Sequence, residues 1–176
     1  MRGMYMLKAW RSMALGALIA VPVMAQKPDF SGTWKLNVAT SFLGSDHPAK
    51  DYEMTKIFVQ RPGMIEQTDI AEHVSMVNIP LPDSKVTTEL VADGQEHEAT
   101  RPAPFPGMQP YKTRTLAEWQ GSTLVVTESA QFFGGRAISK RRYFLSDDGL
   151  HLIELVEGHS IFNDTEQRLV FDKQLQ

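Results

Sequence analysis

Two segments in the second half of the chain bring cationic and aromatic side chains together. They are Tyr111–Trp119 and Arg136–Leu145, and they contain Arg114, Trp119, Arg136, Lys140, Arg141, Arg142 and Tyr143. A guanidinium and a phenol that face one apolar cavity form a suitable pair for binding a carboxylate. The candidate ligand-binding residues for a small hydrophobic or carboxylate-bearing molecule are therefore Arg141, Tyr143, Trp119 and Arg114.

The same charges have a simpler explanation, which the sequence leaves open. Alternate residues of a half-buried strand face solvent, and charged side chains normally occupy that face. Lys140 and Arg142 fit this pattern, and Arg141 fits it at the end of a strand. In the first segment, one face carries Thr113, Thr115, Ala117 and Trp119, and the other carries Lys112, Arg114 and Glu118.

Other kinds of chemistry find no support in the sequence. The histidines are scattered, and none pairs at a spacing that would place two ligands on one strand face. The chain has no cysteine, no Gly-x-Ser-x-Gly motif and no phosphate-binding glycine loop before a helix. We therefore name no catalytic residue, no metal ligand and no cofactor, and the sequence leaves open whether the chain is an enzyme.

Short β-rich segments separated by turn residues position these side chains. The expected strands are Thr33–Val38, Tyr52–Gln60, Met64–Ala71, His73–Ile79, Lys85–Val91, Glu96–Thr100, Tyr111–Trp119, Thr123–Phe133, Arg136–Leu145, Leu150–Glu157 and Glu166–Lys173. Most connections are short, which favours antiparallel pairing of successive strands, and Asp93-Gly94 is a hairpin signal. We predict an all-β fold, an antiparallel meander of about ten strands that closes into a barrel.

The first 25 residues have the pattern of a cleaved signal peptide. Arg2, Lys8 and Arg11 precede an apolar run, and a Val-Met-Ala sequence ends at Ala25. We predict cleavage between Ala25 and Gln26, with export to the periplasm or out of the cell, and one domain over 26–176. Cleavage lowers the formal net charge from −3 to −6 because three basic residues and no acidic one are lost. An acidic chain is a poor partner for nucleic acid, and we expect no stable membrane insertion.

Four phrases of the sequence resemble a group of exported, mostly uncharacterised bacterial proteins with lipocalin-like (calycin-type) β-barrels. The phrases are Asp29–Asn37, which includes Gly32-Thr33-Trp34, and Trp119–Val126, Arg142–Gly149 and Leu169–Lys173. A barrel of the fatty-acid-binding type is equally close in shape. The resemblance implies that Trp34 closes one barrel end and that an Arg from the last strand, here Arg168, packs on its ring. Gly32, Trp34 and Arg168 are therefore the expected barrel-closing residues, with a structural role.

Two longer connections interrupt the series of strands. Ala39–Lys50 follows the first strand, and Arg101–Pro110 contains four prolines, which makes it a stiff loop and excludes a strand. Either loop is a plain connection or a lid over the mouth of the barrel.

Three functions stay open on this basis. The first is a soluble binder of a small apolar or amphipathic ligand, which requires a cavity. The second is a structural or protein-interaction module of the cell envelope with a filled barrel. The third, with less support, is an enzyme on a barrel scaffold, for which the sequence offers no convergent titratable groups.

Overall fold

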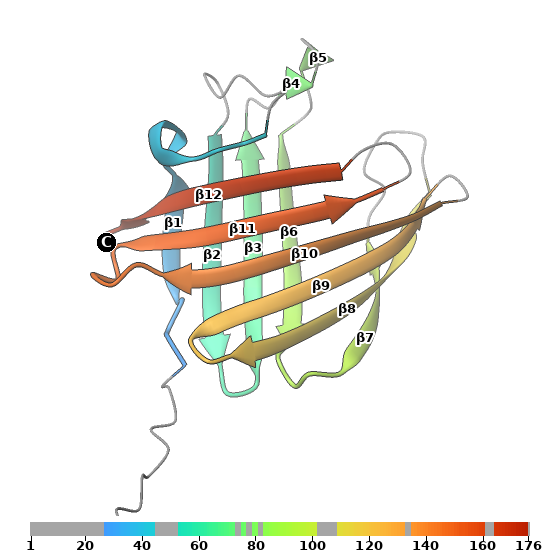
Figure 1. The fold of residues 1–176 in the computed structure, drawn as a ribbon, viewed down its shortest axis with the longest axis horizontal. Coiled ribbons are helices and arrows are strands. Elements are labelled where there is room, and N and C mark those ends of the chain that lie inside the picture. The colour runs from blue at the N-terminus through green and yellow to red at the C-terminus, as the bar shows by residue number, and fades with distance from the viewer. Residues whose placement is uncertain are drawn as a thin grey trace, which may run out of the picture.

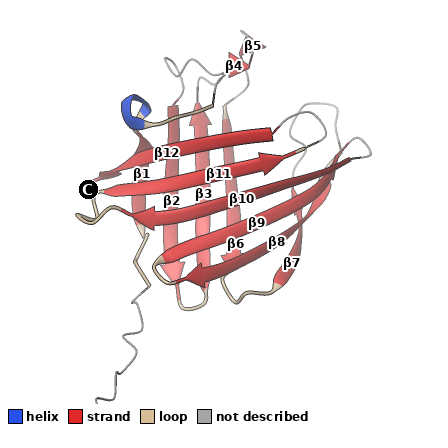
Figure 2. Cartoon of the chain, in the orientation of Figure 1, coloured by secondary structure: helices blue, strands red, loops and turns tan. Residues whose placement is uncertain are grey.

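The computed structural model describes residues 27–44, 53–72, 75–76, 79–80, 83–101, 109–132, 135–160 and 164–175. The expected signal peptide lies outside these residues. Figure 2 shows that strands dominate the described chain, with one short 3-10 helix, η1 (Val38–Thr40). Among the described residues, no helix has the length and apolarity needed to cross a lipid bilayer.

Ten strands form one antiparallel sheet. They are β1 (Gly32–Leu36), β2 (Glu53–Arg61), β3 (Met64–Glu72), β6 (Ser84–Val91), β7 (Glu96–Arg101), β8 (Tyr111–Gln120), β9 (Thr123–Phe132), β10 (Gly135–Leu145), β11 (His151–His159) and β12 (Asp164–Gln174). Two further short strands, β4 (Ser75–Met76) and β5 (Ile79–Pro80), pair only with each other. The expected single strand His73–Ile79 is therefore replaced by a small two-stranded ladder.

The sheet curls into a nearly closed barrel. Its strand order is β6-β3-β2-β1-β12-β11-β10-β9-β8-β7, so the first strand pairs with the last. Figure 1 shows two layers whose strands cross at a steep angle, with β1, β2, β3 and β6 behind β8 to β12. The all-β, antiparallel, ten-stranded barrel predicted from the sequence is confirmed.

The barrel lacks one backbone ladder, between β6 and β7. These strands lie at the two ends of the strand order although they follow each other in the sequence. Asp93-Gly94 makes a turn, but Ala92 N–H donates to the Gly63 carbonyl and Gly94 N–H donates to the Ala117 carbonyl. The hairpin expected at this turn is wrong, because each end of the turn is tied to a different neighbouring strand.

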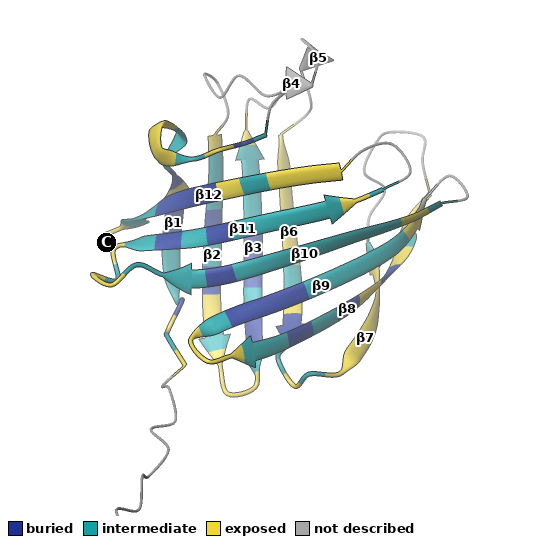
Figure 3. Cartoon of the chain, in the orientation of Figure 1, coloured by how far each residue is buried: buried dark blue, intermediate teal, exposed yellow. Residues whose placement is uncertain are grey.

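Side chains that face the barrel interior fill one end of it. Phe30 packs against Phe58 and Trp119, with ring centroids 6.0 and 5.4 Å away. Trp34, Leu124 and several other apolar residues in the same core cluster are also buried. Figure 3 shows the buried segments of β9 to β12 gathered toward the left of the view, whereas the right-hand ends of these strands are less buried. One end of the barrel is therefore a packed apolar core.

The cation over Trp34 is Lys173, not Arg168. The register of β1 with β12 places Lys173 opposite Trp34, and its ammonium lies 5.2 Å from the centroid of the indole ring. Arg168 is five residues away on β12, an odd number, and so faces the outside of the barrel. Its guanidinium donates to the Thr40 carbonyl at 3.1 Å. The expected packing of Arg168 on Trp34 is therefore wrong, because the alternation of side chains along β12 places Arg168 on the outer face.

Trp34 also holds the chain that covers the packed end. Its Nε1–H donates to the Phe30 carbonyl at 2.8 Å, and Trp34 and Phe30 are fully buried. We expect Trp34→Phe to destabilise the protein by about 2 kcal/mol, because the Phe30 carbonyl loses its donor and a cavity forms. Urea denaturation measures the change, with Leu150→Ala at an exposed position as the control. A loss equal to that of the control would contradict this role of Trp34.

Candidate functional site

A buried ammonium links the two layers of the barrel. Lys56 on β2 has a side chain that is only 3% exposed, and its Nζ lies 2.8 Å from Asp69 Oδ1 on β3. The same Nζ lies 3.1 Å from Glu154 Oε2 on β11, in the opposite layer. The rings of Tyr143 and Phe171 lie 5.7 and 5.5 Å from the ammonium. Ion pairs and ring faces together compensate for the desolvation of this charge.

The protonation states in this cluster follow from the contacts. Burial alone would lower the pKa of Lys56, but the negative charges of Glu154 and Asp69 raise it above its usual range. Burial, followed by the Glu154 carboxylate, raises the pKa of Tyr143, so its hydroxyl stays protonated and donates to Glu154 Oε1 at 2.9 Å. Burial opposes ionisation of Asp69, yet Lys56 lowers its pKa. The cluster therefore holds charged Lys56 and Asp69 beside a neutral phenol.

Arg141 is the inward-facing cation with unused donors. It alternates with the fully buried Tyr143 on β10, and its partner on β9 is the buried Val126. Its Nε lies 4.0 Å from Glu154 Oε1, and among the described residues the guanidinium makes no hydrogen bond. Its side chain is nevertheless 35% accessible, and because it points inward this surface faces the barrel interior. Arg141 can therefore receive an anion without breaking an existing hydrogen bond.

A second polar cluster lies farther along the inner face. Arg101 on β7 donates from Nη2 to Glu128 Oε2 at 2.7 Å and from Nη1 to Thr88 Oγ1 at 2.5 Å. Thr88 is on β6, so this guanidinium spans the position where the backbone ladder is missing. Burial, and then the charge of Glu128, raise the pKa of Tyr111, which keeps its hydroxyl protonated. Arg101 thus fixes Glu128 in place and joins the two unpaired edges.

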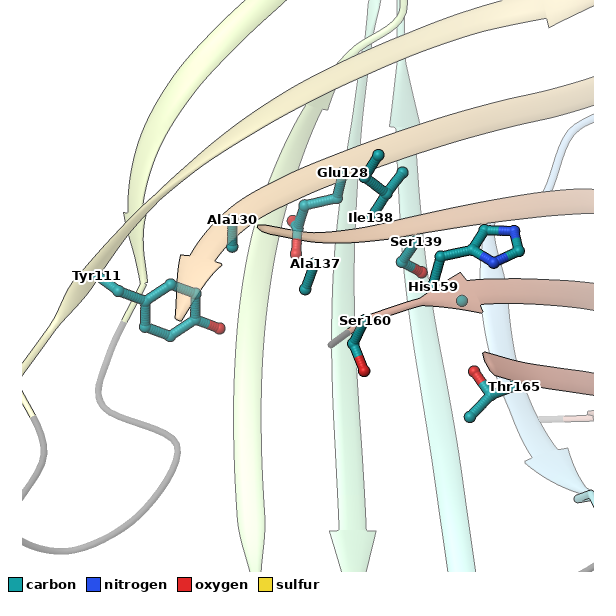
Figure 4. A pocket seen from close by; sticks show the side chains of 10 residues that line it. Tyr111, Glu128, Ala130, Ala137, Ile138, Ser139, His159, Ser160 and Thr165 are labelled. Carbon is teal, nitrogen blue, oxygen red and sulfur yellow. The ribbon is translucent and has the colours of Figure 1, made fainter. Parts of the chain in front are cut away.

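A cavity opens beside this second cluster, at the end of the barrel opposite the packed core. Its volume is about 210 Å³. The lining residues are Tyr111, Glu128, Ala130, Ala137, Ile138, Ser139, Gly158, His159, Ser160 and Thr165. Figure 4 shows Tyr111 and Thr165 on opposite sides, with Glu128 and Ser139 between them. The inward positions that pair across β9 and β10 here carry small side chains, such as Ala130 opposite Ala137, and these leave the space unfilled.

A different hollow lies outside the packed end. It has a volume of about 380 Å³ and is bordered by Lys27, the β2–β3 turn at Arg61–Gly63, and Trp119. Lys27 lies over the indole of Trp119, with its ammonium 5.8 Å from the ring centroid. The buried ring of Phe30 packs on Trp119 from within the core. The cavity lined by Glu128 lies on the inner face next to Arg141 and is therefore the better candidate site.

The fold is shared with solved proteins that are described as a fatty acid transporter and a lipid binding protein. A protein described as the REP1-NXSQ fatty acid transporter superposes with a TM-score of 0.53 at 10% identity, covering 83% of this chain and 96% of that one. Lipid binding protein 8 of Caenorhabditis elegans, in its apo form, gives a TM-score of 0.52 at 13% identity, covering 82% and 95%. The chain has a fatty-acid-binding-type barrel fold. No protein-family model and no curated protein sequence matches it.

The structure brings together two of the four residues named as ligand-binding candidates. Arg141 and Tyr143 share the inner face of β10, although the hydroxyl of Tyr143 is engaged by Glu154. Trp119 also points inward but belongs to the packed end, against Phe30. Arg114 lies on the outer face, where its side chain is 63% exposed and its Nε is 3.9 Å from Glu98 Oε2. Arg114 and Trp119 are thus separated from the cavity by the alternation and the length of β8.

The sequence reasoning missed the other charged residues on the inner face around Arg141. Lys56, Asp69, Glu128 and Glu154 all point inward, but each lies in a strand with apolar residues on both faces. Around Glu154, for example, Leu152 and Val156 face inward while Ile153 and Leu155 face outward. Alternation alone does not identify the inner face of such a strand. Among the described residues, no group of three or more potential ligands could hold a metal ion.

Removing the ammonium of Lys56 tests the cluster. We expect Lys56→Met to destabilise the protein by about 3–5 kcal/mol, because the buried Glu154 carboxylate loses the ammonium next to its Oε2. Lys35→Met is the matched control, since Lys35 pairs with Glu53 at 3.3 Å on the surface, and a change of at most about 1 kcal/mol is expected there. Urea denaturation at neutral pH measures both. Equal effects of the two substitutions would contradict the buried ion pair.

Proposed function

We propose that the protein is an exported, soluble binder of a small amphipathic molecule whose carboxylate lies against Arg141. The observation that carries the proposal is an inward-facing guanidinium with unused donors next to a cavity. Ser139, the next inward residue along β10 toward the cavity, and Glu128, which pairs with Ser139 from β9, both line that cavity. A guanidinium in a partly enclosed site binds a carboxylate through charge-assisted hydrogen bonds.

The cavity and the fold support the same kind of ligand. Alanine side chains provide apolar walls, and polar groups occur at a few points, as in sites that bind small amphipathic molecules. The volume of about 210 Å³ favours a short molecule or the polar end of a longer one. The two carriers that share the fold are described as a fatty acid transporter and a lipid binding protein. The alternative function, a module of the cell envelope, would have a barrel filled from end to end, and this cavity is less consistent with it.

Substituting Arg141 tests the proposal. We expect octanoate to bind the wild-type protein, and Arg141→Gln to weaken this binding by roughly 10- to 100-fold, the range for a hydrogen bond to a charged group. Isothermal titration calorimetry measures the affinity. Arg142→Gln is the matched control, because the neighbouring Arg142 faces outward and pairs with Glu157. Binding of octanol as tight as that of octanoate, or the same loss in both variants, would contradict the role of Arg141.

Export has its own test. We expect a chain expressed with residues 1–176 in a Gram-negative host to accumulate outside the cytoplasm and to begin at Gln26, because the Ala25–Gln26 bond follows a signal-peptidase pattern. Intact mass spectrometry of the purified protein gives the position of cleavage, and native spectra show any small molecule that co-purifies. A full-length chain in the cytoplasmic fraction would contradict export without affecting the binding proposal.

A further inference from the structure

Glu128 presents a free hydrogen-bond acceptor to the cavity. Its Oε2 accepts from Arg101 at 2.7 Å and is 3.4 Å from the donor Thr115 Oγ1. Among the described residues, Oε1 has no hydrogen-bond partner, and the side chain is 21% accessible. Because Glu128 lines the cavity, a bound ligand covers this oxygen. The fit of the ligand therefore depends on what it places against Oε1.

A plain hydrocarbon chain is a poor partner for Glu128. It would remove water from a charged oxygen without replacing the lost hydrogen bond, which is costly for an ionised acceptor. A ligand carboxylate at the same point would meet a like charge. A ligand hydroxyl group would donate a hydrogen bond to Oε1 and so replace the bond from the displaced water. The carboxylate of Glu128 thus favours ligands that carry a donor at this position.

The strand register places Glu128 close to the proposed anion site. Arg141 pairs with Val126, and Ser139 pairs with Glu128, so Arg141 and Glu128 are diagonal neighbours on the inner face of β9 and β10. Such neighbours lie about 7–8 Å apart along the sheet, within reach of long side chains. One ligand can therefore contact both residues when its hydroxyl and its carboxylate are close together.

We propose that the cavity selects a hydroxylated carboxylate whose hydroxyl lies on a carbon near the carboxylate, with Glu128 as the specificity-determining residue. This inference rests on the proposed function, because it assumes that Arg141 holds the carboxylate. Arg101 contributes by binding Oε2 of Glu128, which leaves Oε1 available to a ligand. The Arg101 guanidinium beside this acceptor also disfavours an ammonium in place of the hydroxyl.

Calorimetric titration with matched acids tests the inference. We expect β-hydroxyoctanoate to bind the wild-type protein roughly 10- to 100-fold more tightly than octanoate, the range for a hydrogen bond to a charged group. ω-Hydroxyoctanoate, with its hydroxyl at the far end, gains no such advantage. β-Aminooctanoate binds more weakly than the β-hydroxy acid. A stronger preference for the amine, or equal affinities for octanoate and β-hydroxyoctanoate, overturns the inference.

Variants of Glu128 locate the preference. In Glu128→Leu the ratio of affinities for the β-hydroxy acid and octanoate falls to about one, because the hydroxyl loses its acceptor and octanoate no longer covers an unpaired charged oxygen. Glu128→Gln, which keeps an acceptor oxygen, gives an intermediate ratio and serves if the leucine variant does not fold. Glu157→Gln is the matched control, because Glu157 also pairs with an arginine, Arg142, but on the outer face. A wild-type ratio in Glu128→Gln and Glu128→Leu overturns the assignment to Glu128.

The outcomes separate the two proposals. Octanoate binding that depends on Arg141, without any preference for the hydroxy acid, leaves the proposed function standing and overturns the role of Glu128. Failure of every carboxylate to bind overturns both. A hydroxyl preference that disappears in Glu128→Leu, together with loss of both acids in Arg141→Gln, supports both.

Discussion

The ammonium of Lys56 is the interaction on which the barrel depends. It lies where the two layers of the sheet face each other, bound to Asp69 in one layer and to Glu154 in the other. A buried charge tolerates few arrangements, because each partner that moves away leaves an uncompensated ion. A shift of β2 by one residue would turn Lys56 outward and leave Glu154 without its counter-charge. The charge cluster therefore selects one register for strands that apolar packing alone would position less strictly.

Lys56 also marks the border between two kinds of interior. On one side, large rings such as Trp34, Phe58 and Phe171 fill the space between the layers. On the other side, the inward positions carry Ala130, Ala137 and other small residues, and a cavity results. The same strands build both halves, so side-chain size alone decides where the barrel is solid and where it is hollow. Arg141 lies next to this border. The packed core therefore supports it on one side, and the cavity lies on the other.

Alternation and turn residues predict the fold of this chain well and its site only in part. Strands such as Tyr111–Trp119 are apolar on one face, and their inner residues follow directly from the sequence. Strand β11 is apolar on both faces, and its inward Glu154 could not be distinguished from a surface carboxylate. Pairing of Lys56 with Glu154 is a contact between distant segments, which no local pattern records. The ladder missing at Asp93-Gly94 has the same origin, since distant backbone groups at Gly63 and Ala117 bind the ends of that turn.

In the part of the chain that the structure describes, no backbone ladder joins β6 to β7, and we call this line in the barrel wall the seam. Nine neighbouring pairs of strands in the described sheet are joined by backbone hydrogen bonds, whereas β6 and β7 are joined through side chains, with Arg101 reaching Thr88 and Glu128. Widening the barrel at this seam breaks the Arg101–Thr88 bond but no backbone ladder, so it costs far less than parting any other pair. The Glu128 that faces the cavity is held by the same guanidinium. Arg101 and Glu128 lie on the same side of the seam, so their ion pair stays intact when the Arg101–Thr88 bond breaks, and the carboxylate keeps its place in the cavity wall.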